Sequence, residues 1–190
     1  MKLVSDIAVL RASPLVGLQA FAQADSLSPK NTSFVWKSVL VALMLLLSLT
    51  ASPLTASTER NLEARDVIAA LNADRAQNDL APLAANPRLE EAARKKAEDL
   101  LKIGYFAHTS PIGLEPWDFI RAAGFDYSYA GENLAMNYGN ADELESDFLQ
   151  SPSHRENLLS PNYTDVGVAV VQGLYQGQEA VITVQMFGTP

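Results

Sequence analysis

The spacing of apolar residues changes once along the chain, from a helical pattern to runs typical of strands. From residue 58 to residue 159, apolar side chains recur every three or four positions between polar ones, which predicts amphipathic helices. Residues 166–187 are rich in β-branched residues, which predicts strands. Helices followed by late strands predict an α+β fold, a three-layer α-β-α sandwich around a small, mainly antiparallel sheet.

Each predicted helix carries recognisable start or stop signals. Asn86-Pro87 places a capping residue before a proline at the first helical position, and Gly104 is a natural end for the same helix. Asn140, followed by Glu143 three residues later, resembles a capping box. Ser151-Pro152 repeats the cap-and-proline start. The predicted helices cover about residues 58–78, 87–103, 116–123, 141–150 and 152–159.

Two strands are predicted near the end of the chain, at Val166–Val171 and Ala180–Phe187. The segment between them, Gly173 to Gln178, is short enough for an antiparallel hairpin loop. Alternate residues of the second strand are apolar on both sides, so helices should cover both faces of the sheet. Gly131–Ala135 is interpreted as an extended or turning segment.

An apolar run from Val39 to Leu49 has the length of a signal-peptide core and is short for a membrane span. Lys30 and Lys37 precede it, and small residues at 50–52 and 55–57 offer cleavage points. Residues 34–56 are therefore interpreted as a signal peptide, with an uncleaved membrane anchor as the alternative. Either interpretation predicts export to a secreted or extracytoplasmic location.

Residues 1–33 fit poorly in front of such a signal, because they show no firm periodicity. We interpret them as unstructured or as a misassigned start, with translation beginning near Val35. Peptides from residues 1–30 in the full precursor would contradict that hypothesis. The folded domain is then expected over residues 57–190.

Composition excludes several classes of function. The chain has no cysteine, so it has no disulfide framework, thiolate metal site or cysteine nucleophile. Residues 57–190 hold 10 Lys and Arg against 20 Asp and Glu, which argues against a nucleic-acid surface. The basic run Arg94-Lys95-Lys96 is interpreted as a solvated helix face.

The helix that starts at Ser151-Pro152 contains His154, one of two histidines in the chain. In the first turn of a helix, the positive end of the dipole disfavours an imidazolium. A neutral imidazole can bind a metal or accept a proton. This position therefore favours chemistry at His154.

Four motifs in one order resemble the CAP superfamily: cysteine-rich secretory proteins, antigen 5 and plant pathogenesis-related proteins. Without cysteine, the chain looks like the compact bacterial branch of that family. The resemblance covers about Leu62 to Phe187 and implies an α-β-α sandwich. The motifs are FAHTSP at 106–111, GENL at 131–134, SPSHRENLL at 151–159 and VQMFG at 184–188.

The resemblance implies a cleft containing His108, Glu132 and His154. Many eukaryotic relatives have a second cleft glutamate, and Ser151 stands in the place that aligns with it here. Glu143 and Glu145 are the acids that the preceding helix offers instead. Relatives of the bacterial branch usually have tryptophan where this chain has Phe148, a change that should preserve apolar packing.

Two imidazoles and one carboxylate are a donor set for zinc or another divalent cation. The alternative is a polar hydrogen-bond network that pins loops to the sandwich. Catalysis is disfavoured, because Ser153 and His154 are neighbours on a helix and diverge. A hydrolase could otherwise use Glu132 as a base, or Ser110 or Ser153 as a nucleophile.

We therefore expect an exported CAP-domain binding module whose cleft takes a divalent metal ion, an envelope component, a lipid or another small ligand. Two alternatives remain open: a metal-assisted hydrolase of peptide or cell-wall substrates, and a structural or interaction domain with a polar core. Contact with a membrane is expected only through residues 34–56, if these are not removed. Each hypothesis depends on where His108, Glu132 and His154 lie in the fold.

Overall fold

A computed structural model describes residues 61–190 and the two-residue strand Val9–Leu10. The interpretation of residues 34–56 and the hypothesis of a later start lie outside the described residues. The elements, in chain order, are β1 (Val9–Leu10), α2 (Ala64–Gln77), β2 (Ala84–Ala85), α3 (Pro87–Ile103), α4 (Pro116–Ala122), β3 (Tyr129–Met136), α5 (Ala141–Gln150), α6 (Pro152–Leu158), β4 (Asp165–Tyr175) and β5 (Gln178–Thr189).

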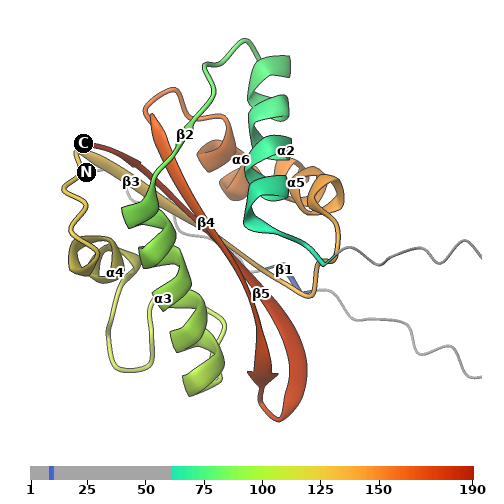
Figure 1. The fold of residues 1–190 in the computed structure, drawn as a ribbon, viewed down its shortest axis with the longest axis vertical. Helices are drawn as coiled ribbons and strands as arrows, with labels where there is room; N and C mark the ends of the chain where they lie inside the picture. Colours follow the sequence, from blue (N-terminus) through green and yellow to red (C-terminus); the bar gives the residue numbers. More distant parts are fainter. Residues whose placement is uncertain (1–8, 11–60) are drawn as a thin grey trace, which may run out of the picture. The chain divides into compact units, whose positions relative to one another are not determined.

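The sheet runs in the order β1-β3-β5-β4-β2 (Figure 1). The long strands β3, β5 and β4 pair antiparallel, whereas the short β1 and β2 add parallel pairs at the two edges. The prediction of a small, mainly antiparallel sheet is confirmed. The last strand of the domain, β5, lies in the middle of the sheet.

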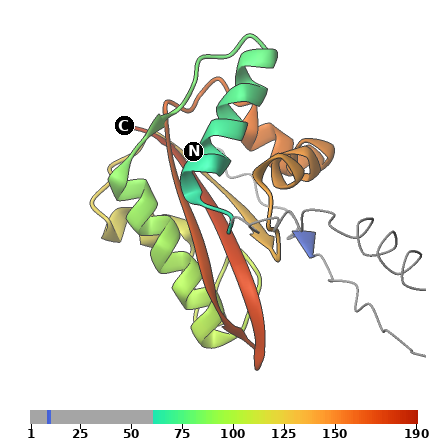
Figure 2. The ribbon, with the colours of Figure 1, turned by 45° about the vertical axis from the view of Figure 1, so that its right-hand side comes forward.

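Helices cover both faces of the sheet, as the apolar pattern of β5 predicts (Figures 1 and 2). On one face, α3 and α4 pack against Ile182, Val184 and Met186 of β5. On the other face, α2, α5 and α6 pack against residues that include Phe187 and Val168. The α-β-α sandwich is therefore confirmed, with one apolar core on each side of the sheet.

The capping signals place three helix ends correctly. Asn86 accepts a hydrogen bond from the amide of Arg88 at the start of α3, and Gly104 ends that helix with φ 76°. Asn140 accepts from the amide of Glu143 at the start of α5. The first helix begins later than residue 58, because residues 61–63 are not helical.

Two predictions about the strands need correction. The Gly131–Ala135 segment is part of an eight-residue strand, β3, which pairs along its whole length with β5. The hairpin between β4 and β5 turns at Gln176 and Gly177, which have φ 52° and 83°. Two residues with positive φ suit the right-handed twist of a tight hairpin, so both strands extend into the segment predicted as a loop.

Gly167 of β4 lies directly against the first turn of α3. A Cβ added at this glycine would lie 2.0 Å from the backbone nitrogen of Glu90 and from the carbonyl carbon of Leu89. Side chains essentially never approach backbone so closely. The absence of a side chain at Gly167 therefore sets the distance between α3 and the sheet.

Candidate functional site

His108 and Glu132 meet although they lie on different elements. His108 is in the loop that follows α3, and Glu132 is on β3. The Nδ1 atom of His108 lies 2.6 Å from Oε1 of Glu132, and their side chains are 16% and 1% exposed. The structure thus brings together two of the three residues that the family resemblance implies, and His108 marks the solvent side of the pair.

Burial raises the pKa of the Glu132 carboxyl, and the hydrogen bond to His108 together with the charge of Lys96 opposes that rise. A carboxyl group removed from water favours its neutral form, while a nearby cation favours the ionised form. The Glu132 carboxyl is therefore held between two opposing influences, a nearly dry environment and its contacts with His108 and Lys96.

His154 lies on α6 and is almost completely buried. Its Nδ1 atom lies 2.8 Å from Oγ of Ser151, and its ring is 4.8 Å from the ring of Phe148. Ser151 occupies the N-cap position of α6, but its side chain makes no cap hydrogen bond. The prediction that Ser151 caps through its side chain is therefore wrong, because the hydroxyl orients the His154 ring instead.

The pKa of His154 is lowered to about 4, first by burial and then by the charge of His108. The imidazole is therefore neutral at pH 7, as the sequence predicts. Burial is the main cause, whereas the position in the first turn of a helix predicts the same direction through the helix dipole. His108 thus acts electrostatically on His154 as well as bonding to Glu132. We call His108, Glu132 and His154 the histidine centre.

Each member of the histidine centre has one buried polar atom without a hydrogen-bond partner. These atoms are Nε2 of His108, Oε2 of Glu132 and Nε2 of His154. Buried polar groups in folded proteins are almost always hydrogen-bonded. The histidine centre therefore holds three buried polar atoms whose hydrogen-bonding capacity the protein itself does not use.

Zinc takes imidazole and carboxylate donors, so the residue types of the histidine centre fit a divalent metal ion. Within residues 61–190, however, no group of three or more His, Cys, Asp or Glu side chains is arranged to hold a metal ion. This arrangement does not favour a three-ligand site at His108, Glu132 and His154. Metal binding there stays a prediction.

A buried polar network lies behind the histidine centre. Asn133 donates to the carbonyl of His154 at 3.3 Å and to Oε1 of Gln185 at 3.1 Å. Asn157 donates to the carbonyl of Glu132 at 3.1 Å and to Oδ1 of Asn133 at 2.9 Å. These bonds connect β3, β5 and α6, so the network fixes the backbone of both Glu132 and His154.

Glu145 extends this network, a role that the sequence did not predict for it. Its side chain is buried and accepts a hydrogen bond from Nε2 of Gln185 at 2.5 Å. Burial raises its pKa to about 8. The spacing of the sequence could have indicated this burial, because Glu145 lies three residues before Phe148 and one after Leu144, on the buried face of α5.

Ser110 and Ser153 do not lie where the hydrolase hypothesis would require a nucleophile. The hydroxyl of Ser110 accepts from the amide of Leu114 at 2.9 Å, within its own loop. The hydroxyl at Nδ1 of His154 is that of Ser151, rather than of Ser153. This placement gives no support to Ser110 or Ser153 as a nucleophile.

The basic run at residues 94–96 is only partly solvated. Lys95 is exposed and pairs with Glu98 at 3.3 Å. Lys96 is fully buried. The prediction of a solvated face is wrong for Lys96, because tertiary contacts surround its side chain.

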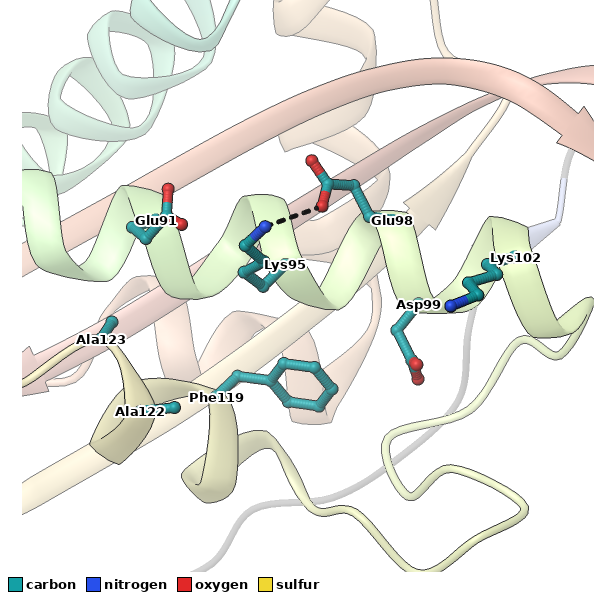
Figure 3. Close-up of a pocket in the computed structure, with 8 residues that line it drawn as sticks. All are labelled: Glu91, Lys95, Glu98, Asp99, Lys102, Phe119, Ala122 and Ala123. Atoms are coloured by element: carbon teal, nitrogen blue, oxygen red, sulfur yellow. Dashed lines mark hydrogen bonds and ion pairs between the residues drawn. The ribbon is translucent and has the colours of Figure 1, made fainter.

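A groove separate from the histidine centre lies between α3 and α4 (Figure 3). Charged residues of α3 line one side, and Phe119 with two alanines lines the other. Asp99 and Phe119, which line this groove, also take part in the surroundings of Lys96. The groove and the histidine centre therefore lie near the same buried lysine.

Comparison with known proteins identifies relatives along most of the described chain. The family model for the cysteine-rich secretory protein family, CAP, matches residues 68–187. YkwD of Bacillus subtilis is 35% identical over 108 residues, which are 57% of this chain and 42% of the relative. YlbC, a membrane protein of the same organism, is 31% identical over 111 residues, 58% of this chain and 32% of the relative.

Solved structures with this fold include an extracellular protein with an SCP domain from Bacillus anthracis. The TM-score is 0.58 at 26% identity, over 67% of this chain and 40% of that one. An outer surface protein of Borrelia burgdorferi has a TM-score of 0.59 at 21% identity, over 67% of this chain and 96% of that one.

The matched region spans less than half the length of YkwD and YlbC. None of the helices among residues 61–190 is long and apolar enough to cross a membrane.

Proposed function

The chain belongs to the cysteine-rich secretory protein (CAP) family, and on this premise we propose that it is an extracytoplasmic binding module whose histidine centre takes a small polar ligand. One observation carries the proposal. His108, Glu132 and His154 each keep one buried polar atom without a partner. A ligand with hydrogen-bonding groups, or a divalent cation, would satisfy these atoms.

Electrostatics support a polar ligand. His154 is neutral at pH 7, so its ring presents one donor or one acceptor rather than a charge. The His108–Glu132 pair adds a ring nitrogen and a carboxyl oxygen that also lack partners, Nε2 of His108 and Oε2 of Glu132. The centre can therefore match either a donor or an acceptor on the ligand.

Binding to the purified protein tests the proposal with two probes, Zn²⁺ alone and a mixture of soluble muropeptides from bacterial cell wall. We expect calorimetry to detect at least one of them, and His108→Ala and His154→Ala to weaken that binding at least tenfold. Glu156→Gln, at an exposed position of α6, is the matched control and should bind as the wild type does. The proposal fails if neither probe binds, or if both alanine variants fold and bind normally.

A structural role for the same residues is the second candidate, and the buried Asn133–Asn157–Gln185 network favours it. In that case His108→Ala and His154→Ala would lower the melting temperature, while the wild-type protein would bind neither probe. The two candidates thus give opposite results in the same titration.

Export is supported by the apolar run at residues 39–49 and by the similarity to an extracellular protein of Bacillus anthracis. We expect the protein in the extracellular or envelope fraction, with a new N-terminus between residues 50 and 58 if the signal is cleaved. N-terminal sequencing of protein from that fraction checks this. Recovery of the full-length chain from the cytosol alone would contradict it.

A further inference from the structure

Lys96 is a buried cation in the middle of α3. Its side chain has no exposed surface, and the rings of Tyr105 and Phe119 lie 4.9 Å and 5.5 Å from its Nζ atom. A buried ammonium is costly unless its donors are satisfied and its charge is balanced. The burial of Lys96 therefore requires interactions that offset this cost.

The three donors of Lys96 have three acceptors. Nζ donates to the hydroxyl oxygen of Tyr105 at 3.1 Å, to the carbonyl of Ala107 at 3.0 Å and to the carbonyl of His108. Tyr105 in turn donates to Asp99 at 2.6 Å. Two of the three acceptors are consecutive backbone carbonyls of the loop that carries His108. An ammonium group supplies three donors in a tetrahedral arrangement, which suits this set.

These bonds connect a helix to a loop. The loop after α3 has no strand partner that would fix its backbone, and loops are ordinarily less rigid than the elements they join. Lys96 binds the loop at the carbonyl of His108 itself. The ring of His108 must then lie within a narrow range to reach Glu132 at 2.6 Å.

The charges around Lys96 support the same role for this residue. Burial lowers the pKa of Lys96, whereas the carboxyl groups of Glu132 on β3 and Asp99 on its own helix oppose that shift and favour the ammonium. Lys96 in turn favours the ionised form of Glu132, the form that accepts a hydrogen bond from His108. An arginine could not replace this lysine, because a planar guanidinium does not direct three donors as an ammonium does.

We propose that Lys96 is a positioning residue for the histidine centre: by binding the carbonyls of Ala107 and His108 from within α3, it holds the His108 ring on Glu132. Lys96 itself need not touch a ligand. This role concerns the free protein and goes beyond ligand binding. Only the measurement of affinity for Zn²⁺ or muropeptides rests on the proposed function.

The absence of cysteine from the chain allows a selective chemical test. In Lys96→Cys, the single thiolate can be alkylated in denaturant with 2-bromoethylamine, which forms a C–S bond, releases bromide and restores an ammonium at nearly the original length. Iodoacetamide gives a neutral side chain of similar size instead. The protein is then refolded, and Lys95→Cys, treated in the same way, is the exposed control.

The readout is the NMR signal of the hydrogen-bonded ring proton of His108. We expect a downfield signal in the wild type, its loss after iodoacetamide treatment of Lys96→Cys, and its recovery after aminoethylation. All forms of Lys95→Cys should keep it. A folded, iodoacetamide-treated Lys96→Cys protein that retains the wild-type signal would overturn the proposal, since the ammonium would then be unnecessary.

Two further variants keep the test decisive if alkylated protein does not refold. Lys96→Met and Lys96→Arg, made directly in cells, should both lose the His108 signal while circular dichroism shows a folded domain. Retention of the signal in Lys96→Met would equally overturn the proposal. If the wild type binds Zn²⁺ or muropeptides, the same variants should bind at least tenfold more weakly. If the wild type binds neither probe, the proposed function fails, and the NMR result still decides the role of Lys96.

Discussion

Glu145→Gln should stabilise the domain at pH 8.5 by about 4 kcal/mol and leave its stability at pH 5 nearly unchanged. Burial raises the pKa of Glu145 to about 8 from its ordinary value of 4.5. Between pH 4.5 and about pH 8, the folded protein therefore keeps a proton on this carboxyl group that the unfolded chain has already lost. Each pKa unit corresponds to about 1.4 kcal/mol, so the stability falls by that amount per pH unit as pH rises through this window.

His154 has the opposite effect at lower pH. Its pKa is lowered to about 4 from 6.5, so the unfolded chain binds a proton there that the folded protein does not. Stability from this group is present above pH 6.5 and is lost as pH falls towards 4. Between pH 4.5 and 6.5 the slopes of these two groups oppose each other, and above pH 6.5 the slope of Glu145 is no longer offset by that of His154. The wild type should therefore be most stable at mildly acidic pH.

Urea denaturation at several pH values checks this result. The wild-type free energy of unfolding should be nearly flat from pH 5 to 6.5 and fall above that, whereas that of Glu145→Gln should rise to pH 6.5 and above it fall less steeply than that of the wild type. Glu156→Gln, with an exposed side chain, should follow the wild-type curve. A Glu145→Gln curve parallel to the wild type at all pH values would show that this carboxyl is not the buried acid described above.

Gly167→Ala should destabilise the domain by more than about 3 kcal/mol, the upper range for overpacking a well-packed interior. The added methyl group would lie 2.0 Å from backbone atoms of Leu89 and Glu90. Backbone in a helix cannot rotate away as a side chain does, so α3 would have to move as a unit. That movement would also displace Lys96 and loosen the His108 loop.

Soluble yield and urea denaturation measure the effect. Gly139→Ala is the matched control, because nothing lies within 4 Å of a Cβ at that position. We expect Gly139→Ala to change the free energy of unfolding by less than about 1 kcal/mol. A Gly167→Ala protein with wild-type stability would mean that α3 packs further from β4 than the structure has it.

The helices and the last two strands could be predicted because their signals are local. Asn86-Pro87 and Gly104 determine the ends of α3 through caps that involve only neighbouring residues. Strand β3 was not recognised as a full strand, because it buries Glu132 and Asn133 where a strand ordinarily buries apolar residues. The side chain of Asn133 bonds to partners on β5 and α6, and that of Glu132 meets His108 in a distant loop, so no local pattern contains these partners.

The histidine centre could be predicted only through the family resemblance. His108 and Glu132 are 24 residues apart, so their contact arises from the packing of a loop against a strand. The burial of Lys96 and Glu145 was missed for a related reason. A buried charged side chain depends on acceptors or donors that distant elements supply, and spacing alone assigns such residues to solvent or leaves them unassigned.

The central place of β5 in the sheet also bears on when the sheet can form. Because β5 pairs with both β3 and β4, neither of these strands has its central neighbour until residues 178–189 have been synthesised. If the protein is exported as we propose, a chain threaded N-terminus first through a narrow channel could complete the sheet only after residues 178–189 had followed. Without cysteine, that last step would require no disulfide formation.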